Sequence, residues 1–245
     1  MIQNIIKNDS QTIIVTGCNG GIGQAICNRL NNQGFNVIGL DLSKKSFCSA
    51  GSPVIYQYYQ VDLLNNEQLQ DCLDTIRQSF GETLYGLVNN AGRYDALDFL
   101  TTNPGQYESI MSINVYAPFF ISQWFANSLF HFNRPGCIVN IASVSGESGS
   151  KDVVYATSKG ALISMSKSLA MALAPNIRVN SVSPGIIETP MSAKIPAERI
   201  VDYEKRILNQ RLGQPNDIAN AVAFLLDKES NYINGANLSV NGGLH

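Results

Sequence analysis

The sequence TIIVTGCNGGIG at residues 12–23 constrains the fold of this chain more than any other stretch. Its first five residues are apolar or β-branched, which favours a strand buried on both faces. A glycine-rich turn follows at 17–23, and the apolar spacing after it predicts a helix that ends at Gly34. Glycines let a diphosphate approach the backbone, and the free N–H groups at a helix start favour negative charge. This order of strand, turn and helix predicts a dinucleotide-binding unit.

A second strand-like run, FNVIGLD, ends at Asp41, about 20 residues after the turn, as a dinucleotide site requires. A carboxylate there can accept hydrogen bonds from the ribose hydroxyls of adenosine, and its charge would repel a 2′-phosphate. Neither the turn nor Leu42 supplies a cation to offset that repulsion, although Lys44 and Lys45 lie a little further along. The sequence therefore favours NAD over NADP.

Strand-like apolar runs and helical patterns alternate along the rest of the chain. Further strands are expected at 54–61, 84–88, 137–142, 176–185 and 236–240, and helices at 65–81, 105–130, 153–174 and 218–226. Pro118 is expected to bend the long helix. This pattern predicts an α/β fold: one domain, residues 1–245, with a doubly wound parallel sheet between two helical layers. The mixed pattern at about 186–212 predicts a substrate lid.

Composition excludes several classes of protein. The 245 residues carry a net charge of −2 without long blocks of either sign, so we expect no nucleic-acid partner and no membrane-binding patch. The five cysteines are an odd number with no metal-ligand spacing, which indicates reduced thiols and no metal site. The apolar run at the start is too short for a signal peptide, and no window approaches the ~18 apolar residues that a membrane span needs. We therefore expect a cytoplasmic protein with a small-molecule substrate.

Tyr155 and Lys159 are four residues apart in a segment with helical spacing, so their side chains share one helix face. A free phenol titrates near ~10, and a neighbouring cation favours its ionised form. Ser143 directly follows an apolar strand, where its hydroxyl can bond a substrate oxygen beside the phenol. A packed ring beside a solvated amine is the structural alternative for the same spacing.

Six motifs together give the chain a family resemblance. TGCNGGIG (16–23), NNAG (89–92), Asn114, Ser143, YATSK (155–159) and SPG (183–185) resemble the short-chain dehydrogenase/reductase family, in the same order and over essentially the whole chain. The resemblance implies a Rossmann-type fold and hydride transfer between a nicotinamide and a secondary alcohol or carbonyl compound. It implies four catalytic residues: Asn114, Ser143, Tyr155 and Lys159. The cofactor-binding residues that it implies are Gly17, Asn19, Gly21, Ile22, Gly23, Asp41, Asp62, Leu63, Asn90, Ala91, Gly92, Tyr155, Lys159, Pro184, Gly185, Ile187 and Thr189.

Three functions remain open at this point. The first is an NAD-dependent dehydrogenase of a small secondary alcohol. The second is an NADPH-dependent 3-oxoacyl-carrier-protein reductase, the branch that the C-terminal tail resembles most. The third is a catalytically idle NAD-binding or scaffold protein, since fold does not imply activity. Family members are typically tetramers or dimers, and the apolar helices 107–129 and 153–174 are compatible with self-association.

The substrate pocket is expected to be bordered by six side chains: Arg93, Tyr94, Glu147, Val153, Ile186 and Met191. The interval from Ser143 to Tyr155 is one residue shorter than is commonest in the family, so the contour of this pocket wall is expected to differ.

Overall fold

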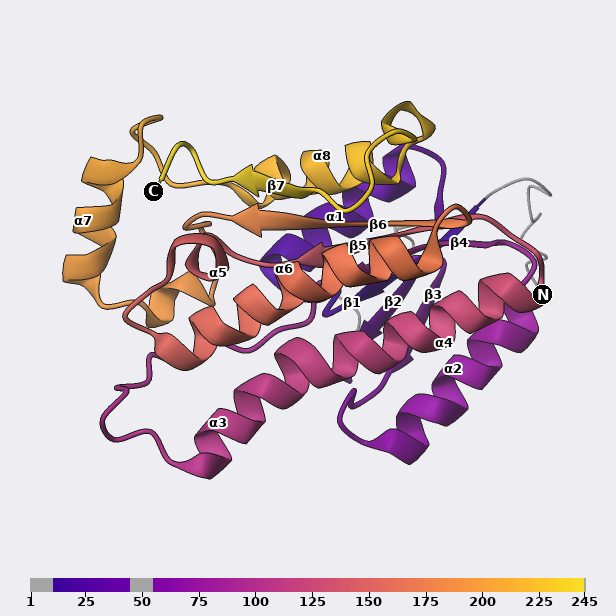
Figure 1. Cartoon of the computed structure of the whole chain (residues 1–245), viewed down its shortest axis with the longest axis horizontal. Coiled ribbons are helices and arrows are strands. Elements are labelled where there is room, and N and C mark those ends of the chain that lie inside the picture. Colours follow the sequence, from indigo (N-terminus) through magenta and orange to yellow (C-terminus); the bar gives the residue numbers. More distant parts are fainter. Residues whose placement is uncertain (1–10, 45–54, 245) are drawn as a thin grey trace.

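One parallel sheet of seven strands, in the order β3-β2-β1-β4-β5-β6-β7, runs through the middle of the computed structural model, which describes residues 11–44 and 55–244 (Figure 1). The strands are β1 (Thr12–Thr16), β2 (Asn36–Asp41), β3 (Gln57–Gln60), β4 (Leu84–Asn89), β5 (Gly136–Ile141), β6 (Ile177–Pro184) and β7 (Asn237–Val240). All neighbouring strands pair in parallel, and the strand order reverses between β1 and β4. The predicted doubly wound Rossmann-type α/β fold is confirmed.

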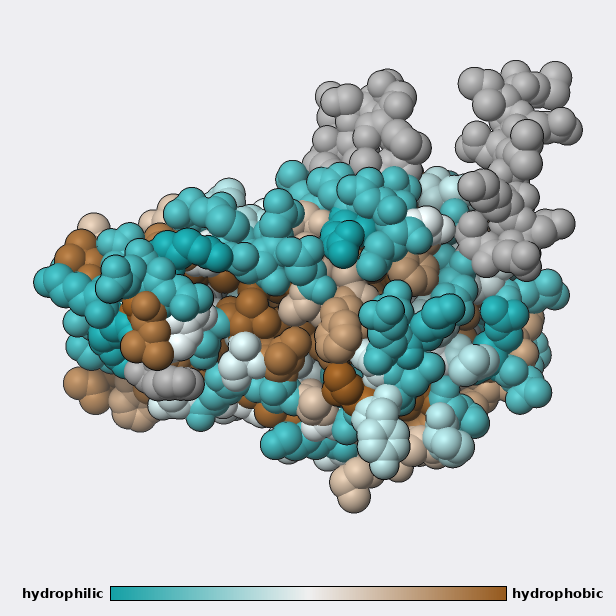
Figure 2. All heavy atoms as spheres, turned by 90° about the horizontal axis from the view of Figure 1, so that it is seen from above, coloured by the Kyte–Doolittle hydropathy of each residue, from teal (hydrophilic) through white to brown (hydrophobic). Residues whose placement is uncertain are grey.

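The helices are α1 (Gly21–Asn32), α2 (Asn66–Phe80), α3 (Pro104–Met111), α4 (Ala117–His131), α5 (Val144–Ser148), α6 (Val153–Leu173), α7 (Ala197–Arg206) and α8 (Pro215–Leu226). The larger ones cover the two faces of the sheet, whereas α7 lies beyond the end of the sheet (Figure 1). Hydrophilic side chains cover much of the face seen in Figure 2, with apolar ones interleaved between them. In the part of the chain that the structure describes, no helix is long and apolar enough to cross a membrane.

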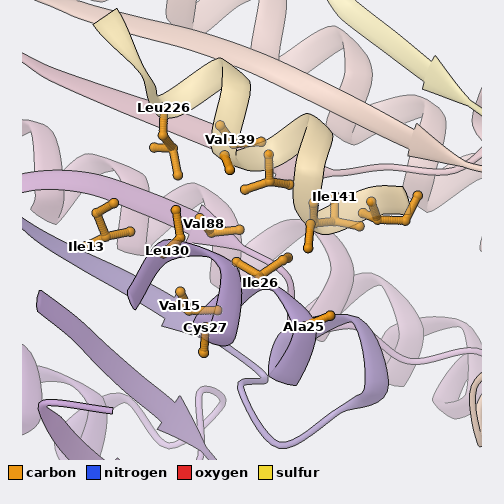
Figure 3. Packing of buried hydrophobic residues seen from close by; sticks show 14 of the residues in the cluster. Ile13, Val15, Ala25, Ile26, Cys27, Leu30, Val88, Val139, Ile141 and Leu226 are labelled. Carbon is orange, nitrogen blue, oxygen red and sulfur yellow. The ribbon is translucent and has the colours of Figure 1, made fainter. Parts of the chain in front are cut away.

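Alternate residues of the central strands face opposite layers. Ile13 and Val15 of β1 pack in the cluster that α1 and α8 close, whereas Ile14 belongs to the cluster under α2 and α4. Figure 3 shows the first cluster, with Ile26 and Leu30 of α1 directed toward the sheet. Each fully buried aliphatic side chain contributes roughly 1.5–3 kcal/mol by leaving water. Both faces of β1 are covered and all five of its residues are buried, as the continuous TIIVT run predicted.

The long helix expected at 105–130 is divided into three parts. A π-helical turn, η1 (Ser112–Tyr116), separates α3 from α4, and Pro118 lies in the first turn of α4. Pro118 has no N–H group and so cannot donate to the carbonyl of Asn114, four residues earlier. The interruption therefore falls where the expected bend was placed.

Two further segments differ from the expected elements. The strand expected at 54–61 is reduced to β3, which lies at the sheet edge and is only partly buried. The segment after Ser143 begins with the short helix α5 rather than an open loop. Between β6 and α8 the chain forms the turn η2 (Ser192–Lys194) and the helix α7, and a further short turn, η3 (Lys228–Ser230), precedes β7.

Candidate active site

A cavity of about 970 Å³ lies at the carboxyl ends of the strands, where the strand order reverses. Every residue that the sequence assigned to the cofactor lines it: Gly17, Asn19, Gly21, Ile22, Gly23, Asp41, Asp62, Leu63, Asn90, Ala91, Gly92, Tyr155, Lys159, Pro184, Gly185, Ile187 and Thr189. Ser143 lines it as well, whereas Asn114 is buried directly behind Gly92. The fold thus brings residues from the ends of six strands, β1 to β6, to one space.

Three glycines of the turn, Gly17, Gly21 and Gly23, have no room for a side chain. Gly17 adopts a positive φ of 63°, and a Cβ atom on Gly23 would lie 2.2 Å from the carbonyl oxygen of Gly17. A Cβ atom on Gly21 would lie 2.9 Å from Cγ2 of Thr189, across the cavity. The N-cap residue of α1, Gly20, offers no side-chain cap, and the first turn of the helix holds no acidic residue. The backbone N–H groups of this turn are therefore suited to a diphosphate, which the residues present fit.

Asp41, the residue expected to bind the adenosine ribose, lines the cavity in a fixed position. Its Oδ2 accepts the backbone N–H of Asn19 at 3.0 Å, and its Oδ1 accepts that of Ser43 at 3.0 Å. Both bonds hold the carboxylate at the end of β2 beside the glycine turn. The side chain of Lys44 is exposed, and Lys45 lies outside the described residues.

Thr16 is a contributor that the sequence analysis missed. Its hydroxyl oxygen accepts the backbone N–H groups of Asn90 at 3.1 Å and Ala91 at 3.0 Å. The Asn90 amide in turn donates to the carbonyls of Thr16 and Gly17, each at 3.0 Å. These four bonds tie the end of β4 to the glycine turn. The signal available in the sequence was a threonine as the last residue of a buried strand, which by itself does not name a partner.

Ser143, Tyr155 and Lys159 meet at the inner end of the cavity. Ser143 caps α5, and its Oγ accepts the backbone N–H of Ser145 at 3.1 Å. Lys159 is buried, donates from Nζ to the carbonyl of Ile141 at 2.7 Å, and lies 5.8 Å from the centroid of the Tyr155 ring. The shared helix face predicted for Tyr155 and Lys159 is thus present in α6, with both side chains turned to the cavity.

Burial shifts both titrating groups of this pair. Burial is the chief cause that raises the pKa of Tyr155 to about 12, the Ser143 hydroxyl acts to lower it, and the charge of Asp152 adds to the increase. Burial alone lowers the pKa of Lys159 to about 8. At neutral pH the phenol is therefore protonated and the amine is a cation, the states required of a proton donor beside a positive charge.

Asn114 is held in η1 by bonds to three groups. Its Oδ1 accepts the backbone N–H of Arg93 at 2.8 Å, and its Nδ2 donates to the carbonyl of Arg93 at 3.0 Å and to Oγ of Ser158 at 2.9 Å. A Cβ atom placed on Gly92 would lie 3.3 Å from Oδ1 of Asn114 and 3.5 Å from Nζ of Lys159. Asn114 therefore positions the 92–93 backbone and the helix that carries Lys159.

The expected pocket border is present in part. Arg93, Tyr94, Ile186 and Met191 line the cavity. Glu147 and Val153 do not, and the structure gives a reason for each. Glu147 is drawn toward β7 by hydrogen bonds from Asn237 and Ser239, and Val153 faces a separate hollow beside α3. In their place the cavity wall includes Asp152, Arg199 and Tyr203, which the sequence analysis did not select.

Comparisons with known proteins agree on the family. A family model described as enoyl-(acyl carrier protein) reductase matches residues 17–245. The 3-oxoacyl-[acyl-carrier-protein] reductase FabG of Rickettsia bellii is 36% identical over 98% of this chain and 99% of its own length. A short-chain dehydrogenase/reductase described as glucose/ribitol dehydrogenase, from Brucella melitensis, superposes with a TM-score of 0.88 at 32% identity, covering 96% of each chain.

A second solved structure, 4-hydroxyisoleucine dehydrogenase complexed with NADH, superposes equally well. Its TM-score is 0.88 at 29% identity, and the match covers 96% of this chain and 98% of that one. The family model, the full-length relative and the shared fold all carry the resemblance that the six motifs first indicated. The chain belongs to the short-chain dehydrogenase/reductase family of oxidoreductases.

Proposed function

We propose that this protein is an NAD(H)-dependent oxidoreductase that interconverts a small secondary alcohol and its carbonyl compound. One observation carries the proposal: the phenol of Tyr155, the buried cation of Lys159 and the hydroxyl of Ser143 line the same cavity as the glycine turn and Asp41. A proton donor, a cofactor cradle and room for a substrate are thereby combined in one space.

Each residue of the proposed site has a distinct role. The nicotinamide, when bound, supplies the hydride acceptor or donor. In the reductive direction Tyr155 donates its phenolic proton to the carbonyl oxygen, and in the oxidative direction its phenolate accepts the proton of the alcohol. Lys159 stabilises that phenolate by its charge, and Ser143 orients the substrate oxygen. Asn114 keeps the Arg93 backbone and α6 in register.

The preference for NAD is supported by Asp41. A 2′-phosphate would add about two negative charges beside a carboxylate that two backbone N–H groups already hold in place. The FabG-like relatives favour the second candidate, an NADPH-dependent 3-oxoacyl-carrier-protein reductase. Against it, Lys44 points to solvent, and Leu42 and Ser43 beside Asp41 carry no charge.

The test compares the two cofactors and then removes the Tyr155 hydroxyl. Wild-type protein should bind NADH more tightly than NADPH in a fluorescence titration, and it should reduce NAD⁺ with secondary alcohols. Tyr155→Phe should abolish turnover and leave the NADH affinity nearly unchanged, because only the proton-transferring hydroxyl is lost. Tyr232→Phe, at a fully exposed tyrosine, is the matched control and should change neither quantity. Tighter binding of NADPH, with activity on a 3-oxoacyl thioester, would favour the second candidate instead.

Two larger features accompany the proposal. The 186–212 segment, which contains η2 and α7, is proposed as the substrate lid because Ile186, Met191 and Arg199 from it line the cavity.

A homodimer or homotetramer is proposed because α3, α4 and α6 leave several large apolar side chains exposed: Tyr107, Phe119, Phe120, Phe130 and Met171. Light scattering tests the second point, and a monomer at micromolar concentration would contradict it.

A further inference from the structure

Four polar side chains from three separate elements form a hydrogen-bonded group on the cavity wall. Asp152 precedes α6, Tyr94 follows β4, and Arg199 and Tyr203 project from α7. All four line the cavity that also holds Tyr155. Arg199 and Asp152 form a two-pronged ion pair, with Nη2 to Oδ2 at 2.7 Å and Nη1 to Oδ1 at 3.2 Å. We call these four residues the 152/199 cluster.

The bonds inside the 152/199 cluster are unevenly distributed over the carboxylate. Oδ2 of Asp152 accepts three donors: Nη2 of Arg199, the hydroxyl of Tyr94 at 3.2 Å and that of Ser150 at 3.3 Å. Within residues 11–44 and 55–244, Oδ1 accepts only Nη1 of Arg199. Since a carboxylate oxygen has two lone pairs, Oδ1 retains capacity to accept one more hydrogen bond.

Arg199 and Tyr203, which lie in the proposed lid segment, supply the spare hydrogen-bond donors of the same cluster. Arg199 Nη2 also donates to the hydroxyl oxygen of Tyr203 at 3.0 Å. Among the described residues, no acceptor pairs with Nε of Arg199 or with the hydroxyl hydrogen of Tyr203. The cluster thus has a spare acceptor and spare donors, and the residues that carry them line the same cavity.

This combination identifies the group that would bind there. An alcohol hydroxyl donates one hydrogen bond and accepts others, so it can satisfy the carboxylate oxygen and a donor together. A carboxylate can only accept, and it would meet an arginine whose charge Asp152 already neutralises. An apolar acyl chain would strip water from the ion pair and replace none of its hydrogen bonds.

We propose that the 152/199 cluster is a subsite for a second hydroxyl group, and that the substrate is a compact polyhydroxylated secondary alcohol. Tyr94 sets the separation of the two substrate groups. Its ring packs edge-on against Tyr155 with the centroids 5.1 Å apart, and its hydroxyl reaches Asp152. The second hydroxyl therefore binds about one tyrosine ring away from the reacting carbon. The inference rests on the proposed function, because it assigns a substrate class to that same site.

The first experiment measures NAD⁺ reduction by wild-type protein with matched alcohols. Pentitols and hexitols are compared with 2-pentanol and 2-hexanol, with 3-hydroxyhexanoate as the anion, and with 3-hydroxybutyryl-CoA as the acyl thioester. The best polyol should exceed the monoalcohol of equal chain length in kcat/KM by about tenfold or more, as expected for one to two added hydrogen bonds.

Two variants then probe the cluster itself. Tyr203→Phe removes one spare donor and keeps the ring, so the polyol-to-monoalcohol ratio of kcat/KM should fall about 3- to 10-fold, chiefly through KM. Tyr232→Phe is the matched control and should leave the ratio unchanged. Asp152→Asn leaves the Arg199 charge uncompensated, so the preference for 3-hydroxyhexanoate relative to the polyol should rise.

The outcomes separate this inference from the proposed function. Turnover of monoalcohols or of the thioester without a preference for polyols would overturn the hydroxyl subsite and leave the oxidoreductase assignment standing. An equal loss for polyol and monoalcohol in Tyr203→Phe would also overturn it, because that result indicates a merely structural role. Wild-type protein that binds NADH but turns over none of these compounds would overturn both.

Discussion

Lys159 is the residue at which function and stability are expected to conflict most clearly. Its amine is buried, and burial lowers its pKa from the ordinary 10.5 to about 8. A difference of that size between folded and unfolded states corresponds to roughly 3 kcal/mol, at 1.36 kcal/mol per unit. The folded protein bears this cost at neutral pH, where the amine is a cation in both states. We therefore expect a pH-dependent stability that belongs to this one side chain.

The direction of the effect follows from where the proton is lost first. Well below pH 8 both states hold the proton, and the cost is present in full. Between about 8 and 10.5 the folded state releases it while the unfolded chain keeps it, so the unfolded state binds more protons and the free energy of unfolding rises with pH. From pH 7.5 to 9.5 the expected rise is about 2 kcal/mol. Tyr155, with a pKa of about 12, stays protonated over this range.

Urea unfolding of wild-type protein and Lys159→Met at pH 7.5 and 9.5 measures the effect. Other groups titrate in both proteins, so the quantity that matters is the difference between their two pH increments, expected at about 2 kcal/mol. Lys167→Met, at an exposed position of the same helix, is the matched control and should keep the wild-type increment. Lys159→Met should also lose turnover. Equal increments in wild type and Lys159→Met would refute the reasoning.

Two further substitutions test the cradle and the core. Gly23→Ala places a Cβ atom 2.2 Å from the Gly17 carbonyl oxygen, so it should lower the free energy of unfolding in urea by about 1–3 kcal/mol and weaken NADH binding. Gly105→Ala, whose Cβ would have its nearest contact at 3.5 Å, is the control and should change neither quantity. Unchanged NADH affinity in Gly23→Ala would contradict the proposed cofactor cradle. Asn140→Ala removes buried hydrogen bonds to Asn89 at 2.7 Å and to Ser166 at 2.8 Å, so it should lower the free energy of unfolding by about 2–4 kcal/mol. The exposed Asn127→Ala is the control and should lower it by less than about 0.5 kcal/mol. Similar values for the two variants would show that this hydrogen-bond network contributes little to stability.

The bounds of a strand were predicted best where both of its faces are buried. The run 12–16 coincides with β1 because helices cover both faces of that strand, so apolar and β-branched residues extend over its whole length. The helix predicted at 153–174 also matches α6, which ends at Leu173. At the edge of the sheet, an apolar run predicts the bounds of a strand less well. β3 is partly exposed, and its tyrosines and glutamines form a shorter strand than the apolar run predicted.

Features that depend on partners distant in sequence could not be predicted. The Asp152–Arg199 pair joins residues 47 positions apart, and neither lies in an apolar pattern that would have indicated burial. The π-helical turn η1 is equally invisible to periodicity, which records which face is apolar but not how the turn is hydrogen-bonded. The pattern of side-chain types along a sequence indicates which residues are buried. The partners of buried polar groups depend instead on the topology, which brings distant residues together.

The role of a buried polar group in this chain therefore depends on its place in the fold rather than on its sequence context. Asn140 and Asn114 are both fully buried amides in apolar segments. Asn140 lies inside β5, where its amide joins Asn89 of β4 to Ser166 of α6 and holds the layers together. One residue further along β5, the carbonyl of Ile141 accepts Nζ of Lys159 at the edge of the cavity. A shift of one position along a strand thus separates a structural network from the candidate catalytic one, and the carboxyl edge of the sheet marks the boundary.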